Sequence, residues 1–432
     1  MRRRTTMMLA VAAGFGLAGT AAAQDVAIRN ATVLTVSNGT IQGGTVLIRN
    51  GKITAVGRDV QVPSGVRVID GTGKYVMPGI IDAHSHTSMD AGLNEGSDAV
   101  TPEVRVQLRA DAMTIYRQLA GGVTTVNVLH GSANVVGGQA AIAKLRWGVP
   151  ADSLYFEGAP RIVKFALGEN PKRSNSTPQP GATRREPTTR MGVEHTLRHW
   201  FTEAVKYRQA WAEYNEAAKR NKDALPPRRD LRLEALVDIL EGRLLVHAHS
   251  YREDEILMLI GVADDFGFKI KAFQHVLEGY KVADEIARHG AGASTFADSW
   301  AYKMEAWDAI PHNAALMAKR GVVVSINSDS DERARRLYQE AAKAIKYGDA
   351  SETEALKMIT LNAAIQLGVQ NRVGSIDVGK DGDIAIFSGH PFAPASKVEM
   401  TLVDGKVMFD ITQAMTLQKL MGATVRTTTE EQ

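Results

Sequence analysis

The chain has 432 residues, 44% of them hydrophobic and 23% charged, which is typical of a globular protein with a substantial buried core. Its formal net charge of +3 comes from 51 basic and 48 acidic residues, and three of the basic residues are Arg2, Arg3 and Arg4. Without these arginines the two counts are equal, so neither nucleic-acid nor membrane-surface binding is predicted. Cysteine is absent, which excludes disulfides and thiolate ligands and leaves histidine, carboxylates or a modified lysine to hold any metal.

The first 23 residues follow the pattern of a secretory signal peptide. The three arginines precede an apolar run from Met7 to Gly19, and the alanines of residues 21–23 supply a small-residue cleavage site. A membrane anchor is the alternative, but a spanning helix needs about 20 apolar residues, and this run is shorter and interrupted by glycine. We therefore predict that residues 1–23 are removed, that the protein is exported to the periplasm or secreted, and that no membrane attachment remains.

Both ends of the remaining chain are rich in short strands. Residues 24–77 alternate apolar and polar positions, and Asn50-Gly51 between two such runs is a strong hairpin signal, because both residues tolerate positive φ. A similar pattern returns in residues 383–387 and 400–409. We expect residues 24–77 and 373–432 to pair into one small β-sandwich domain.

The middle of the chain, residues 78–372, alternates strand-like apolar runs with longer helical patterns, which indicates βα units around a parallel sheet. The strand candidates are residues 80–83, 124–129, 161–165, 244–248, 270–273 and 322–326. A polar or ionisable residue directly follows each of them except the third. A doubly wound sheet would need a glycine-rich phosphate loop after its first strand, and none follows there. We predict an α/β fold in which residues 78–372 form a (β/α)₈ TIM-type barrel, whose chemistry lies at the carboxyl ends of the strands.

Residues 170–190 interrupt this alternation. They are rich in proline, serine, threonine and arginine and have no periodicity, so we predict a long loop near the mouth of the site. Its four arginines are candidates to bind a substrate carboxylate, although such charges in loops are commonly solvated. Beyond it, Leu197, Phe201, Val205 and Trp211 recur at helical spacing and predict an amphipathic helix that packs on the barrel.

Histidines and one aspartate follow the strand candidates. His84 and His86 end the first strand, and side chains two residues apart lie on the same face of a strand, so their imidazoles converge. Later strand ends supply further candidates: His247, His249, His275 and Asp329. Neutral imidazoles and a carboxylate are the set that binds zinc in catalytic sites, where one position stays open for water.

Longer motifs place these residues in a known context. The run Val76–His86, VMPGIIDAHSH, resembles the first-strand signature of the amidohydrolase superfamily, and residues 121–126 resemble its second strand. Residues 360–364 and 374–383 resemble its return into the β domain, so the resemblance extends across most of the mature chain. Within the superfamily the chain is most similar to the imidazolonepropionase-like group, which includes carboxypeptidases of the Xaa-Pro dipeptidase type.

The resemblance implies a role for each candidate. His84 and His86 would bind the more buried metal and His247 and His275 the more exposed one, while Asp329 would ligate the first metal and take the proton of the bridging water. One ligand per strand is expected, so His249 is assigned to the second shell or to substrate. His130 is assigned in the same way, and the glycine-rich residues 131–139 beside it are a candidate substrate loop or a structural turn.

Lys164, in the sequence IVKFALGE, matches the fourth-strand lysine that relatives carboxylate with CO₂ to bridge two metals. Carboxylation requires a desolvated lysine, neutral enough to attack CO₂, whose new negative charge is then neutralised by the cations. A lysine in a simple charge pair is the alternative reading. In that case Glu157 or Glu169 would supply the fourth-strand ligand of a differently organised site.

The sequence therefore predicts an exported, metal-dependent amidohydrolase that cleaves a C–N amide bond of dipeptides or N-acyl amino acids. One or two Zn²⁺ ions, or other divalent metals, would activate the attacking water. A deaminase or cyclic-amide hydrolase on the same scaffold is the nearest alternative. A non-catalytic scaffold is less favoured, because every expected ligand position is filled. The expected partner is a small molecule or dipeptide, and a homo-oligomer is compatible with the sequence.

Overall fold

The structure is a computed structural model that describes residues 25–89, 92–172 and 185–414. The predicted signal peptide lies outside the described residues. Within them, no helix combines the length and the apolar character needed to cross a membrane.

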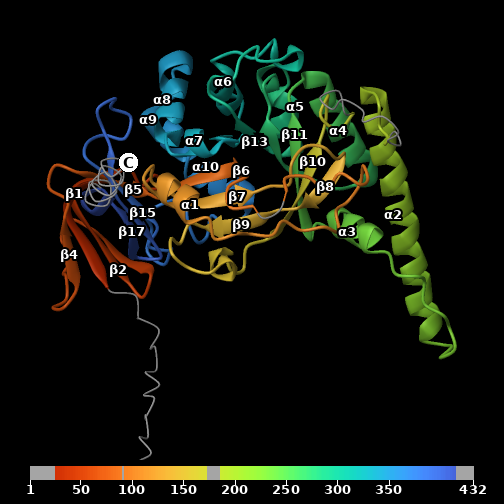
Figure 1. Cartoon of the computed structure of the whole chain (residues 1–432), viewed down its shortest axis with the longest axis horizontal. Coiled ribbons are helices and arrows are strands. Elements are labelled where there is room, and N and C mark those ends of the chain that lie inside the picture. The colour runs from red at the N-terminus through yellow and green to blue at the C-terminus, as the bar shows by residue number, and fades with distance from the viewer. Residues whose placement is uncertain (1–24, 90–91, 173–184, 415–432) are drawn as a thin grey trace, which may run out of the picture.

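Both ends of the chain contribute to one mixed sheet, which lies to the left in Figure 1. Its strands are β1 (Val26–Leu34), β2 (Thr40–Arg49), β3 (Lys52–Gly57), β4 (Arg67–Asp70), β5 (Tyr75–Pro78), β15 (Ile384–Phe387), β16 (Val398–Val403) and β17 (Lys406–Asp410). The antiparallel pairing of β15 with β5 joins the two ends. Asn50 and Gly51 turn the β2–β3 hairpin with φ of 50° and 77°, so this prediction is confirmed. The described strands are ordered as a single eight-stranded sheet, and the expected sandwich of two sheets is not seen among them.

The central strands form two sheets. Most of their strands pair in parallel, and each sheet also has one antiparallel edge strand. The parallel strands are β6 (Ile80–Ser85), β7 (Val123–Val128), β10 (Arg161–Ala166), β11 (Leu244–Ser250), β12 (Ile270–His275), β13 (Gly292–Thr295) and β14 (Val324–Ile326). Between β7 and β10 lie β8 (Val136–Gln139) and β9 (Ala141–Lys144), which pair antiparallel with β10 and β7. The segment from β7 to β8 is too short for the helical crossover that a parallel strand requires, so the chain doubles back.

No closed barrel ladder is formed by the described residues, which corrects the expectation of a regular (β/α)₈ barrel. At the seam between β14 and β6, Ile81 donates its N–H to the carbonyl of Ile359 rather than to β14 (2.9 Å). The seam is instead held by Asp329, whose N–H donates to the His84 carbonyl (3.1 Å), and by Ser328, whose N–H donates to the Asp82 carboxylate (3.1 Å). The arrangement therefore remains barrel-like, with side chains and loops replacing part of the ladder.

Helices cover the strands on their outer side (Figure 1). They are α1 (Ala112–Leu119), α2 (Arg190–Ala218), α3 (Leu231–Leu240), α4 (Glu253–Phe266), α5 (Ala283–His289), α6 (Asn313–Lys319), α7 (Asp331–Ala334), α8 (Leu337–Gly348), α9 (Glu352–Met358) and α10 (Leu361–Leu367). The predicted amphipathic helix is α2, whose buried residues all lie between Val193 and Ala204. Its second half extends away from the body of the molecule in Figure 1.

Helix α10 lies across the amino-terminal end of the strands. Gln366 donates from Nε2 to the carbonyls of Ala293 (3.1 Å) and Val323 (2.8 Å), at the starts of β13 and β14. The interior of the strands above it is polar rather than purely apolar, because Asp82, Lys164 and His247 are fully buried there. Buried polar side chains need hydrogen-bond partners, and the hydrogen bonds among these residues organise the candidate site at the strand ends.

Candidate metal centre

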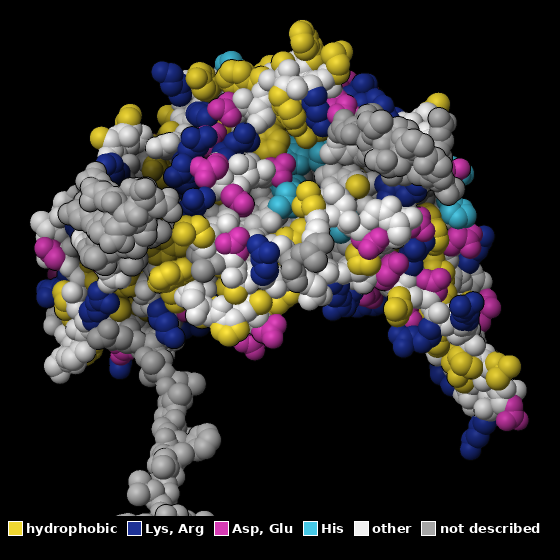
Figure 2. All heavy atoms as spheres, viewed as in Figure 1, with side chains coloured by type: hydrophobic (Ala, Val, Ile, Leu, Met, Phe, Trp, Pro, Cys, Tyr) yellow, Lys and Arg dark blue, Asp and Glu magenta, His cyan; other side chains and the backbone are white. Residues whose placement is uncertain are grey.

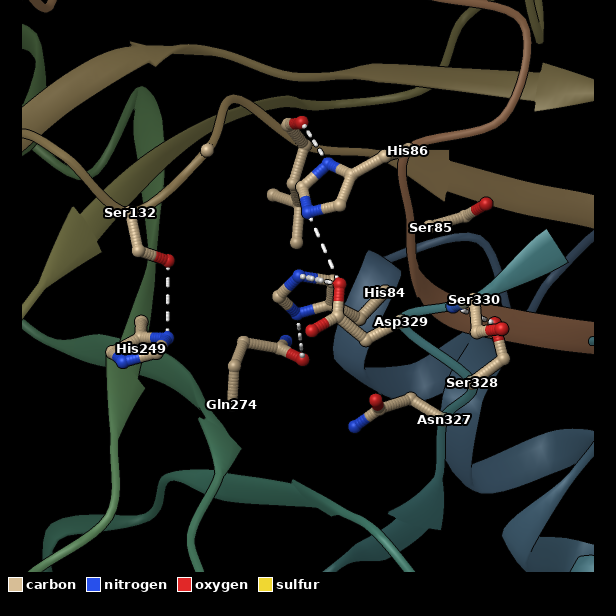
Figure 3. Close-up of polar contacts among 12 residues, drawn as sticks. His84, Ser85, His86, Ser132, His249, Gln274, Asn327, Ser328, Asp329 and Ser330 are labelled. Atoms are coloured by element: carbon tan, nitrogen blue, oxygen red, sulfur yellow. Dashed lines mark hydrogen bonds and ion pairs between the residues drawn. The ribbon is translucent and has the colours of Figure 1, made fainter. Parts of the chain in front are cut away.

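The ends of β6 and β14 bring two histidines and one carboxylate together (Figure 3). His86 Nε2 lies 3.1 Å from Asp329 Oδ1, and His84 Nε2 lies 3.5 Å from the same oxygen. Among the described residues this is the one group of three whose ligand atoms lie within 4.8 Å of each other. Asp329 adopts a left-handed backbone, φ 45°, which a non-glycine residue rarely does and which is common at functional sites.

Hydrogen bonds from Nδ1 of His84 and of His86 determine that Nε2 of each ring faces Asp329. His86 donates from Nδ1 to the carbonyl of Leu129 (2.8 Å), and a carbonyl can only accept. In the neutral ring its Nε2 therefore carries a lone pair, which faces the carboxylate of Asp329 across 3.1 Å. Two acceptors at that distance repel each other unless a proton or a cation lies between them, and a metal ion satisfies both.

A series of hydrogen bonds connects His84, at the carboxyl end of β6, to the backbone of α10 at the opposite end of the strands. His247 donates from Nε2 to the carbonyl of Gln366 (3.1 Å), so its Nδ1 accepts from Gln274 Nε2 (2.9 Å). The amide of Gln274 is thereby oriented, and its Oε1 accepts from His84 Nδ1 (3.2 Å). His84 is left with its Nε2 lone pair toward Asp329. We call Gln366, His247, Gln274 and His84 the axial relay.

His247 and His249 occupy different depths, although they lie on the same face of β11. Two residues of a strand span about 6.6 Å, so His247 lies one layer below the strand ends, level with Lys164 in the pairing register. Both its nitrogens are used by the axial relay. The ring of His249 lies 4.7 Å from that of His275, and its Nδ1 lies 3.0 Å from Ser132 Oγ (Figure 3).

His275 reaches the site through an unusual backbone conformation. In the register of β11 and β12, Gln274 pairs with His249 and shares its face, so the next residue would point away. His275 instead has φ 72°, and its ring centroid lies 4.6 Å from that of His84. Thr295 donates to the His275 carbonyl (2.7 Å) and supports this turn. Within the described residues the Nδ1 of His275 is buried without a hydrogen-bond partner, as expected for a nitrogen that coordinates a metal ion or binds a ligand.

Lys164 on β10 is fully buried beside His84. Its Nζ lies 3.4 Å from His84 Nε2 and donates to the His130 carbonyl (3.3 Å). Burial lowers the pKa of Lys164 to about 8, against the opposing effect of Asp329. Neither alternative glutamate enters the cluster.

Those two glutamates lie elsewhere. Glu157 is exposed in the turn before β10, and Glu169 pairs with Lys303 (3.3 Å).

His130 serves the surrounding loop through both ring nitrogens. Nδ1 donates to the carbonyl of Gly131 (2.9 Å), and Nε2 accepts from the N–H of Glu95 (2.7 Å). The ring therefore anchors the loop at residues 93–98, while the carbonyl of the same residue accepts from Lys164. Residues 136–139 of the glycine-rich run form β8 rather than a loop.

The charge state of the cluster suits a cation. Burial holds the pKa values of His84, His249 and His275 well below their ordinary value, so these imidazoles are neutral and offer lone pairs. Burial alone would raise the pKa of Asp329, but its polar contact with His86 and the positive charge of the nearby Lys164 lower it, so the carboxylate is ionised at neutral pH. Neutral imidazoles around an ionised carboxylate form a donor set for a divalent ion.

The site opens to solvent at the carboxyl ends of the strands. Figure 2 shows histidine side chains within a hollow near the middle of the displayed face. Of the four arginines in the predicted mouth loop, two lie outside the described residues. Arg185 donates to the backbone carbonyl of Asp98 (2.8 Å), and Arg190 pairs with Glu255 (2.5 Å), so both have partners within the chain.

Two polar residues near the site were missed by the sequence reasoning. Gln274 holds a histidine of the cluster, and Arg333 shares a cavity with Asp329. Ser132, which contacts His249, lies in the glycine-rich run that was a candidate substrate loop. A glutamine directly before a strand-end histidine was an available signal for Gln274, because a polar residue inside an apolar strand needs a buried partner. No signal in the sequence distinguished Arg333 from its neighbouring arginines.

Comparison with known proteins places the chain in a family context. Residues 75–408 match the model of the amidohydrolase family. The crystal structure of an amidohydrolase from Thermotoga maritima is 33% identical, with a TM-score of 0.79 over 89% of this chain and 100% of that chain. The amidohydrolase tasK of Hapsidospora irregularis is 30% identical over 85% of this chain, which spans 40% of that longer protein. An imidazolonepropionase of Thermoplasma volcanium is 23% identical over 87% of this chain and 93% of that protein.

Proposed function

The chain belongs to the amidohydrolase family of hydrolases that act on carbon–nitrogen bonds, and we propose that it is an exported metal-dependent hydrolase of dipeptides or N-acyl amino acids. The observation that carries the proposal is the convergence of lone pairs from His84 and His86 on the carboxylate of Asp329. Such a group of acceptors needs a proton or a cation between its members, and a metal ion satisfies all three at once. In the barrel-like fold that the family implies, substrates enter at the strand ends, and this group of side chains lies there.

Residues from several strands would hold the metal. His84, His86 and Asp329 would form the first ligand set, and His249 and His275 would complete the site on its other side. We assign His249 in place of His247, because the axial relay holds His247 one layer below the strand ends, whereas His249 lies at the strand end beside His275. When bound, Zn²⁺ or a similar ion lowers the pKa of water toward about 7 and polarises the substrate carbonyl.

Lys164 is proposed as the bridging residue of a two-metal centre. Its amine is buried, has a lowered pKa and forms no ion pair with a carboxylate of the described chain, which argues against a structural charge pair. In carboxylation the nitrogen forms a bond to the carbon of CO₂ and loses a proton, so that a neutral amine becomes an anionic carbamate. Metal ions bound beside it would balance its charge.

Asp329 is proposed as the group that moves the proton. It is ionised at neutral pH, and its backbone is fixed by the hydrogen bond to the His84 carbonyl. In amide hydrolysis it accepts a proton from the attacking water and delivers it to the leaving nitrogen. A charge-neutral substitution with the same shape, Asp329→Asn, removes this proton transfer and retains an oxygen ligand.

A substrate screen with metal analysis tests the proposal. N-acyl amino acids and dipeptides form one arm, and aminated purines and cyclic amides form the other, with released amino acid or ammonia as the readout. We expect hydrolysis in the first arm, lost in Asp329→Asn while metal stays bound. Turnover confined to the second arm would replace this proposal with a deaminase or cyclic-amide hydrolase, and undiminished activity of Asp329→Asn would refute its role.

Export is tested separately. Expression of the full chain with its first 23 residues should yield a mature protein outside the cytoplasm whose amino terminus is Gln24. A protein retained with Met1 intact would contradict the predicted cleavage.

A further inference from the structure

A second feature of the site is a cavity of about 410 Å³ that opens beside Asp329. Its walls come from the loop after β13 and from α7, and they include Phe296, Trp300, Tyr302 and Arg333. Trp300 is 42% exposed and Tyr302 55% exposed. Exposed aromatic side chains gathered at the rim of a site are typical of ligand contacts.

Arg333 is the unpaired cation of this cavity. Its neighbours Arg335 and Arg336 bind Glu332 and Glu340, whereas Arg333 pairs with no carboxylate of the described chain. Its guanidinium lies 5.3 Å from the ring centre of Phe296.

Hydrogen bonds fix the orientation of Arg333. Nη1 donates to Ser299 Oγ (3.2 Å) and to the Ser328 carbonyl (3.4 Å), which uses both of its hydrogens. Nε and Nη2 donate to no group of the described residues, and they form the side of the guanidinium that binds a carboxylate with two parallel bonds. The anchoring by Ser299 and Ser328 holds this fork in place before a ligand arrives.

The acids near this cavity do not neutralise Arg333. Asp298 also lines it, but its carboxylate is paired with Lys343 (2.5 Å). Asp329 faces His86 in the metal centre. The cavity therefore presents one positive charge beside an aromatic wall, a few residues along the chain from the proton-carrying Asp329.

We propose that Arg333 binds the free α-carboxylate of the amino acid that leaves on hydrolysis, and that Trp300 and Tyr302 contact its side chain. This inference rests on the proposed function, because it assumes that the scissile amide lies at the metal centre. The favoured substrates are N-acyl amino acids or dipeptides whose carboxyl-terminal residue is large and apolar or aromatic. Tyr302 is positioned for this contact by a hydrogen bond to Tyr251 (2.6 Å), which follows β11.

Binding of the leaving amino acid tests the subsite without turnover. Calorimetric titration of the metal-loaded protein with L-phenylalanine and with L-phenylalaninamide should show binding of the acid at least about tenfold tighter, because a bidentate charge-assisted pair is lost in the amide. Arg333→Met should remove the preference, and Arg333→Lys should restore part of it as a point charge. The matched control is Arg336→Met, on the same segment but outside the cavity, and it should bind like the wild type.

Kinetics separate this inference from the proposed function. With N-acetyl-L-phenylalanine as substrate, Arg333→Met should raise KM about 100-fold and change kcat little, as expected for a contact made equally in the ground and transition states. Equal kcat/KM for N-acetyl-L-phenylalanine and its carboxamide in the wild type would overturn the subsite and leave the hydrolase proposal intact. Selective binding of L-phenylalanine without hydrolysis of any N-acyl amino acid would support the subsite and overturn the proposed reaction.

Discussion

Replacing Gln274 by methionine would break the axial relay at its centre. Methionine has nearly the volume of glutamine but neither donates to His247 Nδ1 nor accepts from His84 Nδ1, which are now 2.9 and 3.2 Å from the amide. His84 would then be free to carry its proton on Nε2, where a metal must bind. Loss of such an orienting partner typically weakens metal affinity by about 10–100-fold. Two buried nitrogens left unpaired would also destabilise the fold by roughly 1–3 kcal/mol each.

The assay is metal affinity, measured by competition with a chromogenic chelator, together with nitrogen NMR of the histidine rings in metal-free protein. The wild type should show His84 protonated on Nδ1, and Gln274→Met should show a mixture of tautomers. Gln139→Met is the matched control, because Gln139 is also a buried glutamine with two partners, Pro102 and Arg161, but lies outside the relay. The control should lose stability and keep its metal affinity. Unchanged affinity and tautomer in Gln274→Met would refute the relay.

Three further predictions follow from the same geometry. His249→Asn should lower metal content, whereas His247→Asn should retain most of the metal with weaker affinity; elemental analysis of both variants checks the assignment, and the reverse order would contradict it. Lys164→Met should lower the metal per chain from two ions to one, and an unchanged ratio would exclude a bridging role. Asp381 has its pKa lowered to about 2 by Arg372 and Lys144 despite burial. The unfolded chain therefore binds this proton more readily than the folded chain. Between pH 4 and pH 2 the wild type should lose about 2 kcal/mol more unfolding free energy than Asp381→Asn, and equal losses in denaturation of the two proteins would contradict this.

The first part of the site could be predicted from the sequence because it depends on strand periodicity alone. His84 and His86 are two residues apart on β6, and Asp329 follows β14, so their convergence needs only the alternation of side chains and the order of strands. The β2–β3 hairpin was predictable for a similar local reason. In both cases a short run of residues specifies the geometry.

The remaining parts of the site and fold depend on contacts between distant residues and on backbone conformations, which a local sequence pattern does not specify. His247 and His249 share one face of β11, so periodicity cannot assign their depth; the carbonyl of Gln366, more than a hundred residues away, decides it. His275 faces the site only because its backbone is left-handed, which the surrounding turn imposes. The short connection after β7 likewise leads into β8 and β9, which pair antiparallel with β10 and β7, and the expectation of a regular barrel overlooked both pairs.

The central claim is that metal bound at His84, His86 and Asp329 carries the hydrolysis. The most direct measurement is a titration of metal-depleted protein with Zn²⁺, following bound metal and amino-acid release from an N-acyl amino acid in the same samples. We predict no turnover without metal, a rate that rises in proportion to bound metal until the site is filled, and no such rise in a His84→Asn, His86→Asn double variant. Full turnover by the metal-free protein, or metal activation that survives in the double variant, would contradict the claim.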